Sequence, residues 1–153
     1  MNPALDKIKD SLNEHPPIAY SENPHGLIVN PANEQGFKVE LRTGKNHYGV
    51  YCDGWHEEFG VEDWKEAVGC FMCALTQEVR LKTFARGNYR YEWILERFED
   101  GMWVPLSMSG LILFPFWRQK KIFYLQNDFI PKPPSAGGRI MSREAADKKE
   151  GTP

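Results

Sequence analysis

FKVELRTGKNHYGVYCD, residues 37–53, is the stretch from which we predict the fold. Its first six residues alternate between apolar and charged side chains, as in a strand with one buried face. Residues 43–46 include glycine and asparagine, which favour a turn, and residues 47–53 return as a hairpin partner. Because strands joined by a short turn pair antiparallel, the stretch predicts an antiparallel sheet.

On both sides of this hairpin, the patterns predict helices and further strands. Residues 27–29 form a short apolar island, typical of an edge strand. After Gly60, apolar side chains recur at helical spacing to about Glu78, which predicts one long helix. Later alternating segments, separated by turn residues, predict more strands. These segments are residues 79–83, 89–96, 102–106, 111–116 and 121–126.

The N-terminal residues predict a short amphipathic helix. Leu5, Ile8 and Leu12 recur at helical spacing, and Pro16 and Pro17 end the pattern. We therefore expect an α+β fold, with an antiparallel sheet of about six or seven strands and the long helix packed across one face.

Length and composition suit one globular domain. The chain has 153 residues, of which 41% are hydrophobic, and we assign residues 1–130 to the domain. Residues 131–153 are rich in Pro, Gly, Ser and charged residues and hold almost no large apolar side chain. Such a segment buries too little area to offset its ordering entropy, so we expect a flexible tail.

Charge and hydropathy argue against several partners. A net charge of −2 provides no global attraction to nucleic acid or to an anionic membrane. The longest apolar run, residues 111–117, is shorter than the ~20 residues of a membrane helix. The charged N-terminus does not resemble a signal peptide, and the odd number of cysteines suits a reducing compartment. We expect a cytoplasmic protein with no membrane or nucleic-acid partner.

The cysteines offer a possible metal site. Cys52, His56, Cys70 and Cys73 follow the pattern C-x3-H-x13-C-x2-C, which supplies four ligands of the kind that zinc prefers. Cys70 and Cys73, however, lie inside the predicted helix, where cysteine also serves as a small buried hydrophobe. A zinc-binding protein or a thiol- or metal-dependent enzyme is therefore the alternative function. The usual hydrolase and nucleotide-binding motifs are absent from the sequence, which favours a protein that is not an enzyme.

An acidic segment with aromatic residues suggests a docking loop. Asp53, Trp55, His56, Glu57 and Glu58 are adjacent in sequence and bring carboxylates next to an indole. Carboxylates would steer a basic partner toward the loop, and Trp55 would anchor it. The alternative interpretation is a structural turn. We expect a small protein-binding module, similar in role to an adaptor or immunity protein, with no cofactor.

The segment LILFPFW, residues 111–117, is apolar on both faces of its predicted strand. Pro115 cannot donate a backbone hydrogen bond and places this strand near a sheet edge. An apolar edge strand predicts a homodimer or partner surface. The alternative is that the N-terminal helix covers it.

Overall fold

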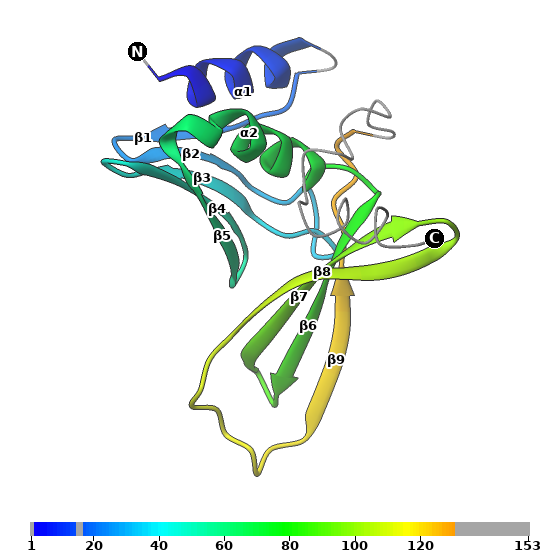
Figure 1. Ribbon diagram of the computed structural model, residues 1–153. Coiled ribbons are helices and arrows are strands. Elements are labelled where there is room, and N and C mark those ends of the chain that lie inside the picture. The colour runs from blue at the N-terminus through cyan, green and yellow to red at the C-terminus, as the bar shows by residue number, and fades with distance from the viewer. Residues whose placement is uncertain (1, 15–16, 131–153) are drawn as a thin grey trace, which may run out of the picture.

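The computed structural model describes residues 2–14 and 17–130 of the chain (Figure 1). The predicted tail at residues 131–153 and Pro16 of the predicted helix stop lie outside these ranges. Within them, the protein is α+β with antiparallel strands and an N-terminal helix, as predicted.

Two helices stack as layers on one sheet. Helix α1 spans Pro3–Glu14, and helix α2 spans Trp64–Cys73 after the short 3-10 helix η1, Val61–Asp63. Figure 1 shows α1 lying on α2, and α2 lying on the first sheet. The buried face of α1 carries Ala4, Ile8 and Leu12, close to the predicted stripe. No helix in the described ranges is long and apolar enough to cross a membrane.

The first sheet has five antiparallel strands in sequence order. They are β1, Ser21–Asn23; β2, Gly26–Val29; β3, Val39–Thr43; β4, His47–Cys52; and β5, Trp55–Gly60. The predicted hairpin of residues 37–53 is confirmed, since Leu41 pairs with Val50 and Val39 with Cys52. Residues 55–58 of the predicted docking loop lie in strand β5, because Asp53 and Gly54 form a tight turn and the chain pairs again with β4.

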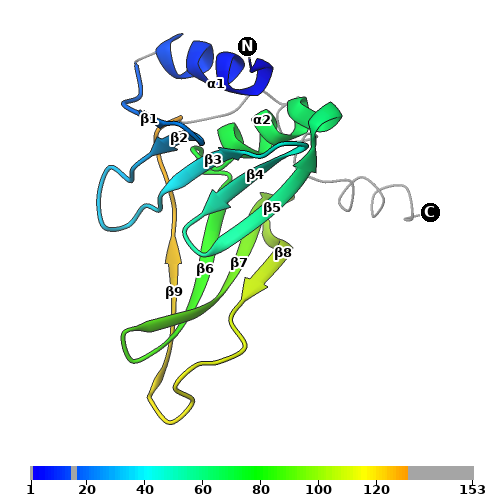
Figure 2. The same cartoon turned by 90° about the vertical axis from the view of Figure 1, so that its left-hand side faces the viewer.

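The second sheet has four antiparallel strands in the order β8-β7-β6-β9. They are β6, Val79–Arg86; β7, Tyr89–Glu99; β8, Met102–Gly110; and β9, Lys120–Leu125. The prediction of a single sheet with six or seven strands is therefore wrong in detail. The predicted strand at residues 111–116 is also wrong, because residues 111–119 form a loop from one edge of this sheet to the other (Figure 2).

Helix α2 ends at Cys73, about one turn before the predicted end at Glu78. The Thr76 hydroxyl donates to the carbonyl of Cys73 and accepts from the amide of Glu78, which offers the backbone an alternative to helical bonds. The carbonyl of Leu75 accepts hydrogen bonds from the amides of Phe129 and Ile130 instead of continuing the helix. A distant segment thus ends a helix that the local pattern would extend.

One hydrophobic core joins both helices and both sheets. It includes Ile8 of α1, Phe71 of α2, Leu41 of β3, Leu81 of β6 and Leu95 of β7. The face of the second sheet that carries Leu81 and Leu95 contributes to this core. Its opposite face carries Arg80 and Tyr124.

Candidate docking surface

The turn before β5 attaches the first sheet to the second. The Asp53 carboxylate accepts hydrogen bonds from the Arg90 guanidinium at 2.8 Å and from the Trp93 indole at 3.2 Å. Gly54 packs so closely that a Cβ there would lie 2.3 Å from the Trp93 ring. These contacts give Asp53 a structural role and leave its carboxylate already paired with a cation.

Trp55 does not form an exposed anchor. Its side chain is 0% exposed and belongs to the core, and its indole N–H donates to the Ser107 hydroxyl at 2.9 Å. A buried indole has no surface to offer a partner. The signal that sequence reasoning missed is the Asp53-Gly54 pair, a typical two-residue hairpin turn that places Trp55 directly opposite buried Cys52.

The remaining members of the predicted docking set are divided between the two faces of β5. Glu57 pairs with Val50, while His56 pairs with Tyr51, and successive strand residues point to opposite faces. His56 is exposed and stacks on the Tyr51 ring with 5.3 Å between centroids. Glu58 shares the His56 face and is exposed, whereas Glu57 lies on the side that α2 covers. The five predicted residues therefore do not form one acidic surface.

The cysteine window does not assemble a four-ligand site. Cys52, Cys70 and Cys73 are buried free thiols, whereas exposed His56 lies on the opposite face of the sheet from Cys52. Burial raises the pKa of the Cys52 and Cys70 thiols far above their ordinary value and that of Cys73 to about 11. No group of three potential ligand residues that could hold a metal occurs within residues 2–14 and 17–130. The observed environment is that of small core side chains.

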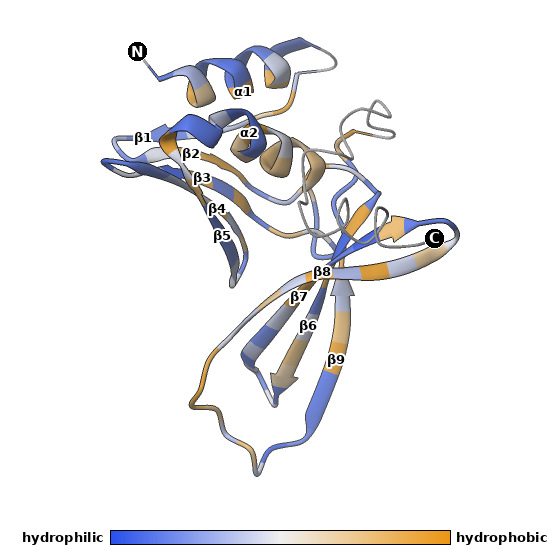
Figure 3. Cartoon of the chain, in the orientation of Figure 1, coloured by the Kyte–Doolittle hydropathy of each residue, from blue (hydrophilic) through white to orange (hydrophobic). Residues whose placement is uncertain are grey.

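The most exposed apolar side chains gather in residues 111–117, which we name the apolar loop. Ile112 is 93% exposed, Leu113 83%, Phe116 71% and Trp117 73%. Figure 3 shows this hydrophobic stretch at the end of the second sheet, away from the helical layers. Helix α1 packs on α2 at the opposite end of the molecule, so it does not cover the loop as the alternative interpretation expected.

The loop is held in place at several points along its length. Phe114 stacks on Tyr91 of β7 with 4.2 Å between ring centroids. The Leu111 amide donates to the carbonyl of Tyr91 at 2.7 Å, and the Arg118 amide donates to the carbonyl of Pro115 at 3.0 Å. Phe114 therefore pins the loop to the sheet, and its apolar neighbours face solvent from a defined backbone.

Four basic side chains lie beside the apolar loop, and we name them the basic collar. They are Arg86, Arg118, Lys120 and Lys121. Arg86 bonds to the carbonyl of Arg118, and the Gly87 amide bonds to the carbonyl of Gln119, so the β6–β7 turn lies against the end of the loop. Among the residues that the structure places, none of the four forms an ion pair with a carboxylate. In the sequence, Asp128 is the first acidic residue after Asp100.

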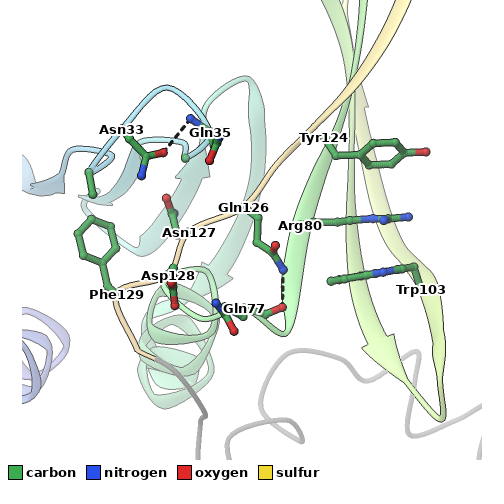
Figure 4. A pocket seen from close by; sticks show the side chains of 12 residues that line it. Asn33, Gln35, Gln77, Arg80, Trp103, Tyr124, Gln126, Asn127, Asp128 and Phe129 are labelled. Atoms are coloured by element: carbon green, nitrogen blue, oxygen red, sulfur yellow. Dashed lines mark hydrogen bonds between the residues drawn. The ribbon is translucent and has the colours of Figure 1, made fainter.

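A cavity of about 560 Å³ lies at the other end of the second sheet (Figure 4). On one wall, the Arg80 guanidinium lies between the rings of Trp103 and Tyr124, at 4.3 and 4.1 Å from their centroids, and pairs with Glu96 at 2.7 Å. The opposite wall is made mostly of amide side chains. Among the described residues that line the cavity, Asp128 is the one carboxylate, and there is no cysteine or histidine. The cavity thus has a cationic and aromatic wall opposite a wall rich in amides.

Comparisons of the chain with models of known protein families, with curated proteins and with solved structures found no significant match.

Proposed function

We propose that the protein is a binding module, adaptor-like in role, that docks through the apolar loop. The observation that carries this proposal is the exposure of Ile112, Leu113, Phe116 and Trp117 on one short, held loop. Single exposed apolar residues are common on protein surfaces, but adjacent ones in a contiguous patch mark interaction sites. Bulky side chains near a patch centre, tryptophan above all, are also typical anchors of a contact.

The apolar loop replaces the acidic segment as the preferred surface. Trp55 is buried, Asp53 is paired with Arg90, and Glu57 and Glu58 point to opposite faces of β5. Capture of a basic partner through Glu58 and His56 stays a prediction, as does a cytoplasmic location. The apolar loop also predicts an acidic partner rather than a basic one, because the basic collar lies beside it.

Site-specific photo-cross-linking in cells that express the full chain tests this proposal. A photoreactive amino acid is introduced at position 113 of the apolar loop or, as a matched control, at exposed Lys7 on α1. We expect adducts at position 113 that are several-fold more abundant than at position 7, whatever the chemical class of the captured molecule. Equal labelling at the two positions would show that the apolar loop is not a docking surface.

A further inference from the structure

Exposed apolar side chains and basic side chains are neighbours at this end of the molecule. Ile112 and Leu113 are the outermost apolar side chains by exposure, Trp117 follows them, and the chain then becomes basic at Arg118. Lys120 and Lys121 begin strand β9, and Arg86 ends β6 beside them. Along the chain, the apolar loop is thus followed directly by positively charged side chains.

A second copy of this chain is a poor occupant for the apolar loop. In a two-fold symmetric contact the same surface of both copies meets, so each basic collar would approach the other around the apolar contact. Within the described part of the chain, no carboxylate pairs with a side chain of the basic collar. The positive charges of the two collars would therefore repel each other. This geometry argues against the homodimer that the sequence suggested for residues 111–117.

We propose that the apolar loop and basic collar dock the protein on an anionic phospholipid bilayer. Such a surface offers acyl chains to Ile112 and Leu113, an interfacial layer that favours the indole of Trp117, and anionic headgroups to the basic collar. The apolar residues precede the basic ones along the chain, and the loop and the start of β9 lie at one end of the molecule (Figures 1 and 2). The contact lies on the membrane surface and needs no spanning helix.

The local charge explains how a chain with a net charge of −2 reaches this surface. Electrostatic attraction to a bilayer falls off within about a Debye length, roughly 10 Å, so the nearest charges dominate. Between Asp100 and Asp128 the sequence holds Arg118, Lys120 and Lys121 and no acidic residue. The expectation of no membrane partner used the net charge and the length of the apolar run, and neither quantity describes one end of a folded molecule.

Vesicle co-sedimentation of the full chain tests this assignment, which rests on the proposed function. The vesicles are phosphatidylcholine alone or phosphatidylcholine mixed with phosphatidylglycerol. We expect binding to the mixed vesicles, at least roughly tenfold weaker binding to phosphatidylcholine alone, and a similar loss at about 0.5 M NaCl. Ile112→Ser with Leu113→Ser should weaken binding to mixed vesicles by roughly tenfold or more, as should Arg118→Glu with Lys121→Glu.

Met102→Ser is the matched control, because Met102 is an exposed apolar residue that begins β8 beside the β7–β8 turn, whereas the loop leaves the other end of β8. It should bind mixed vesicles as the unsubstituted chain does. Failure of the unsubstituted chain to bind mixed vesicles, or equal binding by the Ile112 and Leu113 double variant, would overturn the bilayer assignment. If position 113 then cross-links to a protein or to a second copy, the proposed docking loop stands and only its lipid partner is wrong. If position 113 gives no excess over position 7, the docking function itself fails.

Discussion

At the residue scale, two tryptophans show how little side-chain type alone says about function. Trp55 and Trp117 both lie in segments that suggest docking, beside acidic residues in one case and basic residues in the other. Trp55 is buried and hydrogen-bonded to Ser107, whereas Trp117 is largely exposed. The sequence supplies the residue type, but the fold around it decides whether a partner can reach it.

Alanine substitution of the two tryptophans should separate these roles. Trp55→Ala removes a fully buried indole and should lower the free energy of unfolding by about 3–5 kcal/mol. Trp117→Ala removes an exposed side chain and should change it by no more than about 0.5 kcal/mol. Urea denaturation of both variants measures the difference. A Trp55→Ala protein as stable as the unsubstituted chain would contradict the buried position.

The raised pKa of Cys73 should make stability depend on alkaline pH. Burial raises this pKa to about 11 from an ordinary value near 9.0, so the unfolded chain loses the thiol proton first. This contribution to the free energy of unfolding is fully present below about pH 9 and is lost as pH rises through about 11, by about 2–3 kcal/mol for a pKa raised from 9.0 to about 11. The measurement is the urea midpoint across this range, and Cys73→Ala should show a flatter decline. Parallel curves for the two proteins would mean that the thiol titrates alike in both states.

At the element scale, the sequence predicts a segment well where its pattern is local. The residue 37–53 hairpin alternates cleanly, and the N-terminal helix has a regular stripe, so both occur as predicted. Strand β5 was missed because its sequence, WHEEFG, places charged residues on both faces. The expected strand at residues 111–116 is absent, and these residues form a loop. Phe114 holds this loop to the sheet by stacking on Tyr91, so the backbone does not pair as a strand.

The alternation of β5 can be tested by reversing its two glutamates separately. Glu57→Lys places a cation on the side that α2 covers, where the existing carboxylate already interacts, and should cost about 1–3 kcal/mol of stability. Glu58→Lys changes an exposed side chain and should stay within about 0.5 kcal/mol. Thermal or urea unfolding compares them. Equal effects would contradict the division between two faces.

The Glu58→Lys protein also tests the acidic docking hypothesis, because substitution of this exposed side chain should leave the fold unchanged. If a basic partner binds this strand, its association rate at low ionic strength should fall in the variant, while a neutral substitution such as Ser11→Ala on α1 should leave the rate unchanged. An unchanged association rate would remove Glu58 from the candidate surfaces.

At the scale of the whole molecule, the order β8-β7-β6-β9 could not be predicted from local patterns. Short turns between neighbouring strands suggested a simple meander, in which the last strand follows the one before it. The long loop of residues 111–119 instead carries the chain past β7 and β6, so that β9 pairs with β6. Which edge a strand joins depends on the contacts available to both of its faces, and these contacts involve residues distant in sequence.

Asn127, just after β9, illustrates such a distant contact. Its buried side chain accepts from the amide of Phe37 and donates to the carbonyls of Phe37 and Ala74, at 3.0 Å in each case. One amide thus joins the segment before β3, the end of α2 and the segment after β9. Nothing in the local sequence around Asn127 distinguishes it from an ordinary loop asparagine, because its partners lie 90 and 53 residues away.

Asn127→Ala should therefore destabilise the whole molecule rather than one loop. The substitution leaves three buried backbone groups without this partner and should lower the free energy of unfolding by about 2–4 kcal/mol. Gln126→Ala is the matched control, because exposed Gln126 donates one side-chain bond to Gln77, and its loss should cost less than about 1 kcal/mol. Because the Asn127 amide connects the first sheet, α2 and the chain leaving the second sheet, the loss should appear as a lower midpoint of one cooperative unfolding transition. Two separate unfolding transitions in the Asn127→Ala protein would contradict this. They would show that each sheet is stable on its own and that the Asn127 side chain only couples the unfolding of one sheet to that of the other.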